Sequence, residues 1–133
     1  AADVVVDDVP AWLAAASFAA SAYVVIVTRG HRHDLDALRA VVARDLRYVG
    51  LIGSRAKVAR VYEALMAEGL DPERFTRVHA PIGLDLGAVT PQEIAVSIVA
   101  ELIAVRRGRT ADPAVASACL KWTPKFVTAP SQP

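Results

Sequence analysis

The segment that most restricts the fold of this chain is residues 23–28, Tyr-Val-Val-Ile-Val-Thr, which lacks any polar alternation. A strand of this composition is apolar on both faces, which is typical of a parallel sheet covered by helices on each side. Residues 47–52 form a second predicted strand, and Arg77, Val78 and His79 form a short third one. The sequence therefore predicts a parallel sheet that contains these three strands.

The first two predicted strands are each followed by a segment with helical signals. Asp34 is suited to cap one helix, and Ser54 is suited to cap the next, which Gly69 ends. Asp71 and Pro72 favour a single helical turn ahead of the third strand. Apolar residues at helical spacing form the expected inward faces, which are Leu35, Leu38, Val41 and Val42 in the first helix and Val58, Val61, Tyr62 and Leu65 in the second.

A further helix is predicted from Thr90 to about Arg107. Thr90 and Glu93 form a capping box, and Pro91 fits the first turn. The interior of this helix is almost entirely apolar, apart from a polar stripe of Glu93, Ser97 and Glu101. We expect a helix this apolar to be buried on more than one side, against the sheet and against a second subunit.

The two ends of the chain carry weaker signals. Val4, Val5 and Val6 are interpreted as the end of a strand, followed by a helical stretch over residues 11–20. Because the chain begins without methionine and almost at once inside an apolar run, we expect a fragment or a processed product. After residue 108 the chain is rich in proline and is expected to be an irregular tail. The predicted division is a domain over residues 1–108 and a tail over residues 109–133.

Composition limits the classes of function. A chain of 133 residues, 54% of them hydrophobic, is long and apolar enough for one domain with a core. A formal net charge of +1 provides no strong field to attract nucleic acid. No apolar run approaches the roughly 18–20 residues that a membrane span needs. The single cysteine, Cys119, excludes an internal disulfide and suits the cytoplasm.

Alternation of strands and helices with short connections predicts an α/β fold, a doubly wound and mainly parallel sheet with right-handed crossovers. In such sheets ligands bind outside the carboxyl ends of the strands. This rule selects three loops, which cover residues 28–34, 53–57 and 79–87. They are called the first, second and third loops below.

The first loop combines a hydroxyl, a guanidinium and an imidazole at a strand end, in Thr28, Arg29, Gly30 and His31. The planar donors of arginine suit phosphate or carboxylate oxygens. The spacing of His31 and His33 does not by itself indicate a metal site, because zinc sites need more ligands of known spacing. We therefore predict ligand contacts from this loop and no metal ligand from the protein.

The second loop opens a helix with Gly53, Ser54 and Arg55, and Lys57 follows. Free amides and partial positive charge at a helix N-terminus favour anions, and Arg55 and Lys57 would add formal charge. The spacing matches neither the dinucleotide fingerprint nor a P-loop. A purely structural cap at Ser54 therefore remains the alternative.

The third loop contains His79, Pro81, Ile82, Gly83 and Asp85. Its glycines and proline allow tight backbone angles. The carboxylate of Asp85 could accept hydrogen bonds from a ligand, and an imidazole such as that of His79 can act near neutral pH. The alternative is a structural turn in which Asp85 bonds nearby amides.

Several motifs together resemble a known family. They are residues 48–55 (Tyr-Val-Gly-Leu-Ile-Gly-Ser-Arg), residues 79–87 (His-Ala-Pro-Ile-Gly-Leu-Asp-Leu-Gly), residues 90–95 and 101–108, and residues 28–31. In this order and spacing, over about residues 3–108, they resemble the XdhC/CoxI family. Its members are accessory proteins of xanthine dehydrogenase and related molybdenum hydroxylases.

The resemblance implies a Rossmann-type domain that binds molybdenum cofactor (molybdopterin), assists its sulfuration and delivers it to an apo-hydroxylase of the xanthine dehydrogenase or carbon monoxide dehydrogenase type. It implies a chaperone-like carrier without catalytic residues, acting as a homodimer with a cysteine desulfurase as a further partner. The residues expected to contact the cofactor are Thr28, Arg29, Gly30, His31, Gly53, Ser54, Arg55, Lys57, His79, Pro81, Ile82, Gly83 and Asp85.

The chain departs from the family pattern at its start. Members of the family have an earlier strand and a glycine-rich turn, so we expect the first βαβ strands to be missing and one sheet edge to be exposed. Two other functions stay open. One is an NAD(P)-binding Rossmann oxidoreductase, weakened because the glycine fingerprint and a ribose-binding acid are not visible in order. The other is a non-catalytic dimerisation module that uses the helix over residues 90–107.

Overall fold

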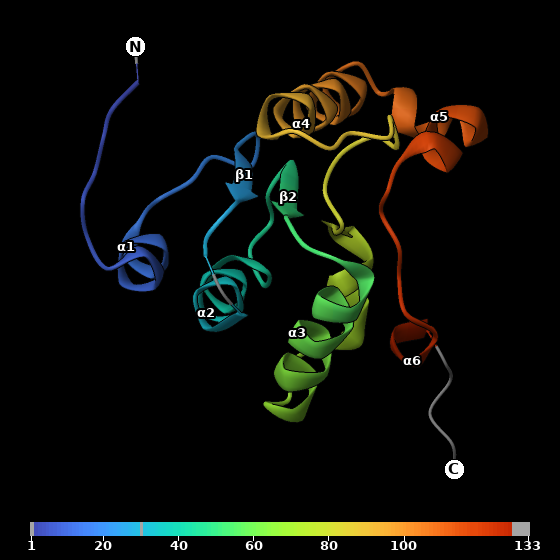
Figure 1. Ribbon diagram of the computed structural model, residues 1–133. Helices are drawn as coiled ribbons and strands as arrows, with labels where there is room; N and C mark the ends of the chain where they lie inside the picture. Colours follow the sequence, from blue (N-terminus) through green and yellow to red (C-terminus); the bar gives the residue numbers. More distant parts are fainter. Residues whose placement is uncertain (1, 30, 129–133) are drawn as a thin grey trace.

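The protein contains a parallel sheet with helices on both faces (Figure 1). The computed structural model describes residues 2–29 and 31–128. The sheet has three strands in sequence order, β1 (Tyr23–Ile26), β2 (Tyr48–Leu51) and β3 (Val78–His79), and both pairings are parallel. The predicted α/β, Rossmann-like fold with a parallel sheet is confirmed.

Helices and short 3₁₀ turns connect and follow these strands. The α-helices are α1 (Val9–Ala15), α2 (His31–Val41), α3 (Arg55–Ala67), α4 (Pro91–Arg106), α5 (Pro113–Ala118) and α6 (Lys125–Thr128). The 3₁₀ helices are η1 (Pro72–Arg77) and η2 (Arg109–Ala111). In Figure 1, α2 and α3 lie below the sheet and α4 lies above it.

Alternate residues of β2 enter two different cores. Val49 and Leu51 are buried in the main core, which also contains the inward faces predicted for α2 and α3. Tyr48 is buried on the opposite face with Ile82 and Val105, against α4. Since successive side chains of a strand point to opposite faces, one short strand joins both layers.

Local capping chemistry sets the start of several helices as predicted. Ser54 Oγ accepts a hydrogen bond from the amide of Lys57 at 3.2 Å, at the start of α3. Thr90 Oγ1 accepts from the amide of Glu93 at 3.2 Å, and the Glu93 carboxylate accepts from the amide of Thr90 at 3.0 Å. These bonds satisfy donors that otherwise lack partners within the first turn.

The N-terminal segment differs from the prediction. Val4, Val5 and Val6 are exposed and form no strand. Among the described residues β1 is paired only with β2, and these valines do not add to its open edge. The predicted helix over residues 11–20 is the shorter α1, which begins two residues earlier.

Asp34 also departs from its predicted role, because it lies inside the first turn of α2 and is not the N-cap. Its side chain is fully buried and is engaged by Thr28 and Lys57. A carboxylate with these partners is held in place by tertiary contacts, which the local sequence pattern does not reveal.

α4, expected to be buried on more than one side, turns a polar face to the rest of the chain. The polar residues Ser97 and Glu101 are buried against the protein. Val96, Val99 and Ile103 on the outer side are 62%, 52% and 55% exposed. Within this chain the helix therefore buries two of the three residues of its polar stripe, leaves Glu93 exposed and also exposes apolar side chains. Burial against a second subunit stays a prediction.

The segment after residue 108 is more ordered than predicted. It forms η2, α5 and α6, and Val127 of α6 belongs to the main core. Figure 1 shows this segment running down beside the third loop and α3. The expected irregular tail is thus largely packed on the domain over its described part.

None of the helices within residues 2–29 and 31–128 combines the length and the apolar character that crossing a lipid bilayer requires.

Candidate functional site

The first and second loops are joined through the buried carboxylate of Asp34. Thr28 Oγ1 donates a hydrogen bond to Asp34 Oδ1, and the Lys57 ammonium forms an ion pair with Asp34 Oδ2. Lys57 Nζ also donates to the carbonyl oxygen of Ile52 at 3.1 Å. Thr28 and Lys57, both predicted ligand contacts, are therefore arranged to hold two loops together at the carboxyl edge of the sheet.

Gly53 shapes the turn between β2 and α3. Its φ is +143°, and a Cβ added there would lie 2.7 Å from Lys57 Cδ. A side chain would therefore displace the lysine that connects the two loops. The turn leads directly into the amides of Arg55 and Ala56, which have no carbonyl partner within the helix and point their positive dipole outward.

The third loop lies directly on α4. Gly83 has a φ of +104°, and a Cβ there would lie 2.2 Å from Ser97 Oγ. Ser97 Oγ donates to the carbonyl oxygen of Leu84 at 2.7 Å, and the amide of Leu84 donates to the carbonyl oxygen of Ser97 at 3.2 Å. Contact this close requires glycine, so the loop conformation is fixed by backbone and side-chain bonds to one helix.

The C-terminal segment supports the third loop from the outside. The Asp85 amide donates to the carbonyl oxygen of Ala118 at 2.8 Å, and the Leu120 amide donates to that of Gly83 at 2.9 Å. Farther along, the guanidinium of Arg55 lies 5.3 Å from the centre of the Trp122 ring. Trp122 therefore holds Arg55 beside the start of α3 by a cation–π contact.

A pocket of about 330 Å³ opens between the second and third loops. Its lining is mainly apolar and includes Ile52, Gly53 and Ile82, with the exposed carboxylate of Asp85 as its charged group. The volume lies within the range of small-molecule sites, which combine apolar walls with a few polar groups. The predicted edge of the sheet is thus a concave surface beside a helix N-terminus.

The predicted contact residues occupy different places around this pocket. Gly53, Pro81, Ile82 and Asp85 line it, and the buried Gly83 lies in the same loop. Ser54 and Arg55 start the adjacent helix, Thr28 and Lys57 join the two loops, and Arg29 is exposed. Gly30 and the side chain of His31 lie outside the described part of the structure. A role in ligand binding stays a prediction for all of these residues.

His79 is directed away from this pocket and belongs to a polar cluster beneath α4. Its ring stacks on Tyr48 with centroids 4.5 Å apart, and its Nδ1 lies 3.7 Å from Glu101 Oε2. Tyr48 Oη donates to Glu101 Oε1 at 2.5 Å, and the amide of Gly83 donates to the same oxygen at 3.2 Å. The cluster connects the sheet, the third loop and α4.

Sequence reasoning placed Glu101 in the polar stripe of α4 but missed its role, because the carboxylate of this residue organises the cluster. Burial raises the pKa of Glu101, but the interactions with His79 and Tyr48 outweigh it and hold that pKa below its usual range. Burial, together with the adjacent carboxylate of Glu101, raises the pKa of Tyr48. The available signal was a glutamate four residues after Ser97 in an otherwise apolar helix. This spacing places both side chains on one face.

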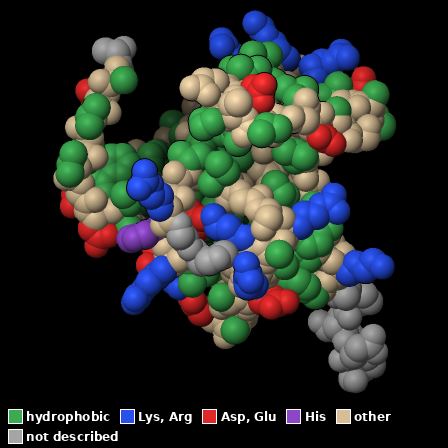
Figure 2. All heavy atoms as spheres, viewed as in Figure 1, with side chains coloured by type: hydrophobic (Ala, Val, Ile, Leu, Met, Phe, Trp, Pro, Cys, Tyr) green, Lys and Arg blue, Asp and Glu red, His purple; other side chains and the backbone are tan. Residues whose placement is uncertain are grey.

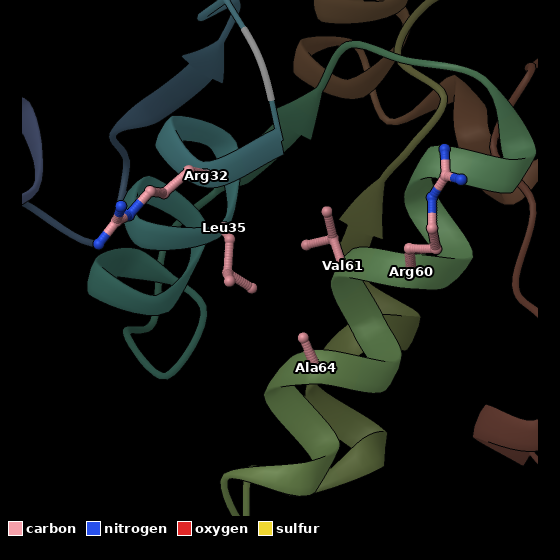
Figure 3. Close-up of a pocket in the computed structure, with 5 residues that line it drawn as sticks. All are labelled: Arg32, Leu35, Arg60, Val61 and Ala64. Atoms are coloured by element: carbon pink, nitrogen blue, oxygen red, sulfur yellow. The ribbon is translucent and has the colours of Figure 1, made fainter.

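Another opening lies between α2 and α3, with a volume of about 430 Å³ (Figure 3). Leu35, Val61 and Ala64 point into the space between the helices, whereas Arg32 and Arg60 extend away from it. It is an apolar groove without the polar groups that orient a ligand. None of the predicted contact residues lines it.

The described residues contain no cluster of three or more histidine, cysteine, aspartate or glutamate side chains arranged to hold a metal ion.

Comparison with known proteins decides the family. The model of the XdhC Rossmann domain matches residues 2–102, which is most of the chain. This protein belongs to the XdhC family. The matched region contains the sheet, all three loops and most of α4. The residues that line the pocket therefore lie within the match, apart from Leu120 of the C-terminal segment.

Two curated relatives share this region. The XdhC domain is 38% identical over 84 residues to an uncharacterized protein, YqeB, of Escherichia coli strain K12, covering 63% of the chain and 15% of the relative. It is 36% identical over 83 residues to a probable xanthine dehydrogenase subunit of Bacillus subtilis strain 168, covering 62% of the chain and 23% of the relative. The chain therefore spans less than a quarter of the length of either protein.

A solved structure has the same arrangement. The crystal structure of a xanthine dehydrogenase from Bacillus halodurans is similar to the XdhC domain with a TM-score of 0.65 and 30% identity. The similarity covers 84% of this chain and 32% of that one. Fold and family thus agree, and the chain corresponds to one part of longer proteins.

Proposed function

We propose that this XdhC domain binds molybdenum cofactor at the pocket between the second and third loops and assists in its delivery to a molybdenum hydroxylase. The observation that supports the proposal is the juxtaposition of the α3 N-terminus with a mainly apolar pocket that has one exposed carboxylate. Family membership and the names of a curated relative and a solved structure point to xanthine dehydrogenase as the class of recipient.

The residues present suit the chemical parts of molybdopterin. The amides of Arg55 and Ala56, with the Arg55 guanidinium held over Trp122, suit a phosphate group. Ile52 and Ile82 offer apolar surface to a flat ring system, and the carboxylate of Asp85 can accept hydrogen bonds from ring or amino N–H groups. When bound, the cofactor supplies the molybdenum centre that the recipient hydroxylase uses.

The finer steps follow from this role as proposals. The domain would hold the cofactor while a cysteine desulfurase provides the sulfur for sulfuration, and would then release it to a hydroxylase of the xanthine dehydrogenase or carbon monoxide dehydrogenase type. The residues of this chain contribute binding and orientation in that scheme. Their place of action would be the cytoplasm, where a reducing environment keeps a thiol such as Cys119 free.

Native mass spectrometry of the chain, produced in a host that makes molybdenum cofactor, tests the proposal. Bound pterin supports the carrier. Bound NAD(P) without pterin would instead support the alternative function, a nicotinamide-binding oxidoreductase, because the same helix N-terminus also suits a pyrophosphate. A dimer that carries neither ligand would favour the dimerisation module.

The exposed side of α4 favours a homodimer as a second proposal. Val96, Val99 and Ile103 form an apolar strip, and Tyr23 and Val25 of the edge strand β1 are also partly exposed. Figure 2 shows hydrophobic side chains gathered over the part of the molecule that contains α4 and the sheet. Exposed apolar surface of this kind commonly marks an interaction site.

A further inference from the structure

A separate cavity of about 400 Å³ lies at the amino ends of the strands, opposite the loop edge. Arg47 directly precedes β2 and Arg77 directly precedes β3, so both line it from the sheet. Thr110, Cys119 and Lys121 line it from the C-terminal segment. The cavity thus joins side chains that are far apart in sequence.

Three cationic side chains converge on this cavity. Among residues 2–29 and 31–128, Arg77 alone of the three has an ion-pair partner, Asp45 at 3.3 Å, which is largely exposed. Arg47 gives one donor to the carbonyl oxygen of Val105 at 2.8 Å. Lys121 Nζ donates one hydrogen bond to the carbonyl oxygen of Thr76 at 2.6 Å. A guanidinium has five donors and an ammonium has three, so each cation retains donors for a further acceptor.

Partial burial of Lys121 strengthens its electrostatic interaction with any neighbouring charge. Lys121 is half-buried, and burial lowers the pKa of its ammonium group. A bound anion would offset this effect of burial, because an opposite charge nearby favours the protonated, charged form of an ammonium group. The carboxylate of Glu101 does not line the cavity, and its Oε1 accepts hydrogen bonds from Tyr48 and Gly83. It lies near enough to Lys121 to raise the pKa of that ammonium, against the larger effect of burial, but it forms no ion pair with it.

We propose that this cavity binds the phosphate group of a small molecule, at a site separate from the pocket for the cofactor. Arginine forks pair with phosphate oxygens through parallel N–H donors, and lysine adds a point charge. The volume lies within the range of small-molecule sites, so the cavity has room for a phosphate ester. The site does not depend on whether the loop edge binds pterin.

Cys119 provides a built-in reporter for the site. It is the single cysteine of the chain and lines the cavity. Burial, together with the nearby carboxylate of Glu101, raises the pKa of its thiol, so alkylation is best measured at mildly alkaline pH. Intact mass gives the rate of modification by the anionic reagent iodoacetate and by the neutral reagent iodoacetamide.

We expect inorganic phosphate or glycerol 1-phosphate to slow alkylation by both reagents in a saturable way at constant ionic strength. The more effective of the two shows whether free phosphate or a phosphate ester is preferred. Without added phosphate, Arg77→Gln or Lys121→Gln should lower the ratio of the iodoacetate rate to the iodoacetamide rate by about fivefold. Each substitution should also weaken the phosphate protection.

Arg60→Gln, at an exposed position of α3 beside the groove between α2 and α3, is the matched loss of one positive charge and should change neither measurement. Far-UV circular dichroism identifies any variant that fails to fold, and Arg77 is exposed enough for its substitution to leave the core intact. Protection by chloride equal to that by phosphate would overturn the proposal. Phosphate protection of Cys119 that is undiminished in the folded Arg77→Gln variant would also overturn the proposal.

Discussion

At the scale of single residues, the candidate site depends on positions where the backbone approaches a neighbour closely. Gly83 combines a positive φ with a position at which an added Cβ would lie 2.2 Å from Ser97 Oγ of α4. Glu101 accepts hydrogen bonds from the Tyr48 hydroxyl and the Gly83 amide. These two residues position the third loop, although neither of them lines the pocket.

Gly83→Ala should lower the free energy of unfolding by about 2–3 kcal/mol, because the methyl group meets strain at positive φ and a steric clash. Gly87→Ala is the matched control. Gly87 also has a positive φ, +70°, but a Cβ there would meet nothing within 4 Å. Urea unfolding should show a larger loss for Gly83→Ala, and equal losses would contradict the close contact.

Glu101→Gln should lower the free energy of unfolding at pH 7 by about 1–3 kcal/mol, because a charged acceptor is lost from buried hydrogen bonds. The pKa of Glu101 is depressed in the folded protein. Its ionisation therefore stabilises the fold above the unfolded value near 4.5 and loses that effect as pH falls through the folded pKa. Unfolding curves between pH 7 and pH 3 should show a smaller acid-dependent loss in Glu101→Gln than in the wild type. Identical slopes would exclude Glu101 as the cause.

At the scale of elements, the sequence predicted the features that depend on residues close together in the chain, such as helix caps and strands. The caps at Ser54, Asp71 and Thr90 and the parallel strands follow from short-range chemistry and periodicity, and the structure confirms them. The burial of the Ser97 and Glu101 side chains on the inner face of α4 could not be predicted in the same way. It depends on Tyr48 and Gly83, which are distant in sequence.

The exposed strip on α4 leads to a prediction at this scale. Val99→Glu should shift a dimer toward monomers in sedimentation velocity, because a charge at a buried interface is costly. Fold stability should change little, since Val99 is 52% exposed in the single chain. Ala67→Glu, at an exposed position at the end of α3, should leave the dimer unchanged. A wild-type protein that is monomeric at high concentration would refute the proposed homodimer.

At the scale of the whole molecule, the topology brings three loops to one edge, as the rule for parallel sheets predicts. The order of the strands sufficed to place Gly53, Pro81, Ile82 and Asp85 at one pocket. It did not suffice for His79, which faces Glu101 on the α4 side of the sheet. The packing of the C-terminal segment on the third loop also escaped prediction. Backbone hydrogen bonds such as that from Leu120 to Gly83 have no local sequence signature.

The most direct test of the central claim is the amount of pterin retained by purified variants produced in a host that makes molybdenum cofactor. Pterin released from the protein is measured by its fluorescence and expressed per mole of chain. Arg55→Ala and Asp85→Ala should each lower the retained pterin by about tenfold while the fold remains intact, because each removes a charged or charge-assisted contact worth roughly 1.5–3 kcal/mol. Arg60→Ala, on the outer surface of α3, should retain as much as the wild type. Full retention of pterin by both Arg55→Ala and Asp85→Ala would contradict the proposed site.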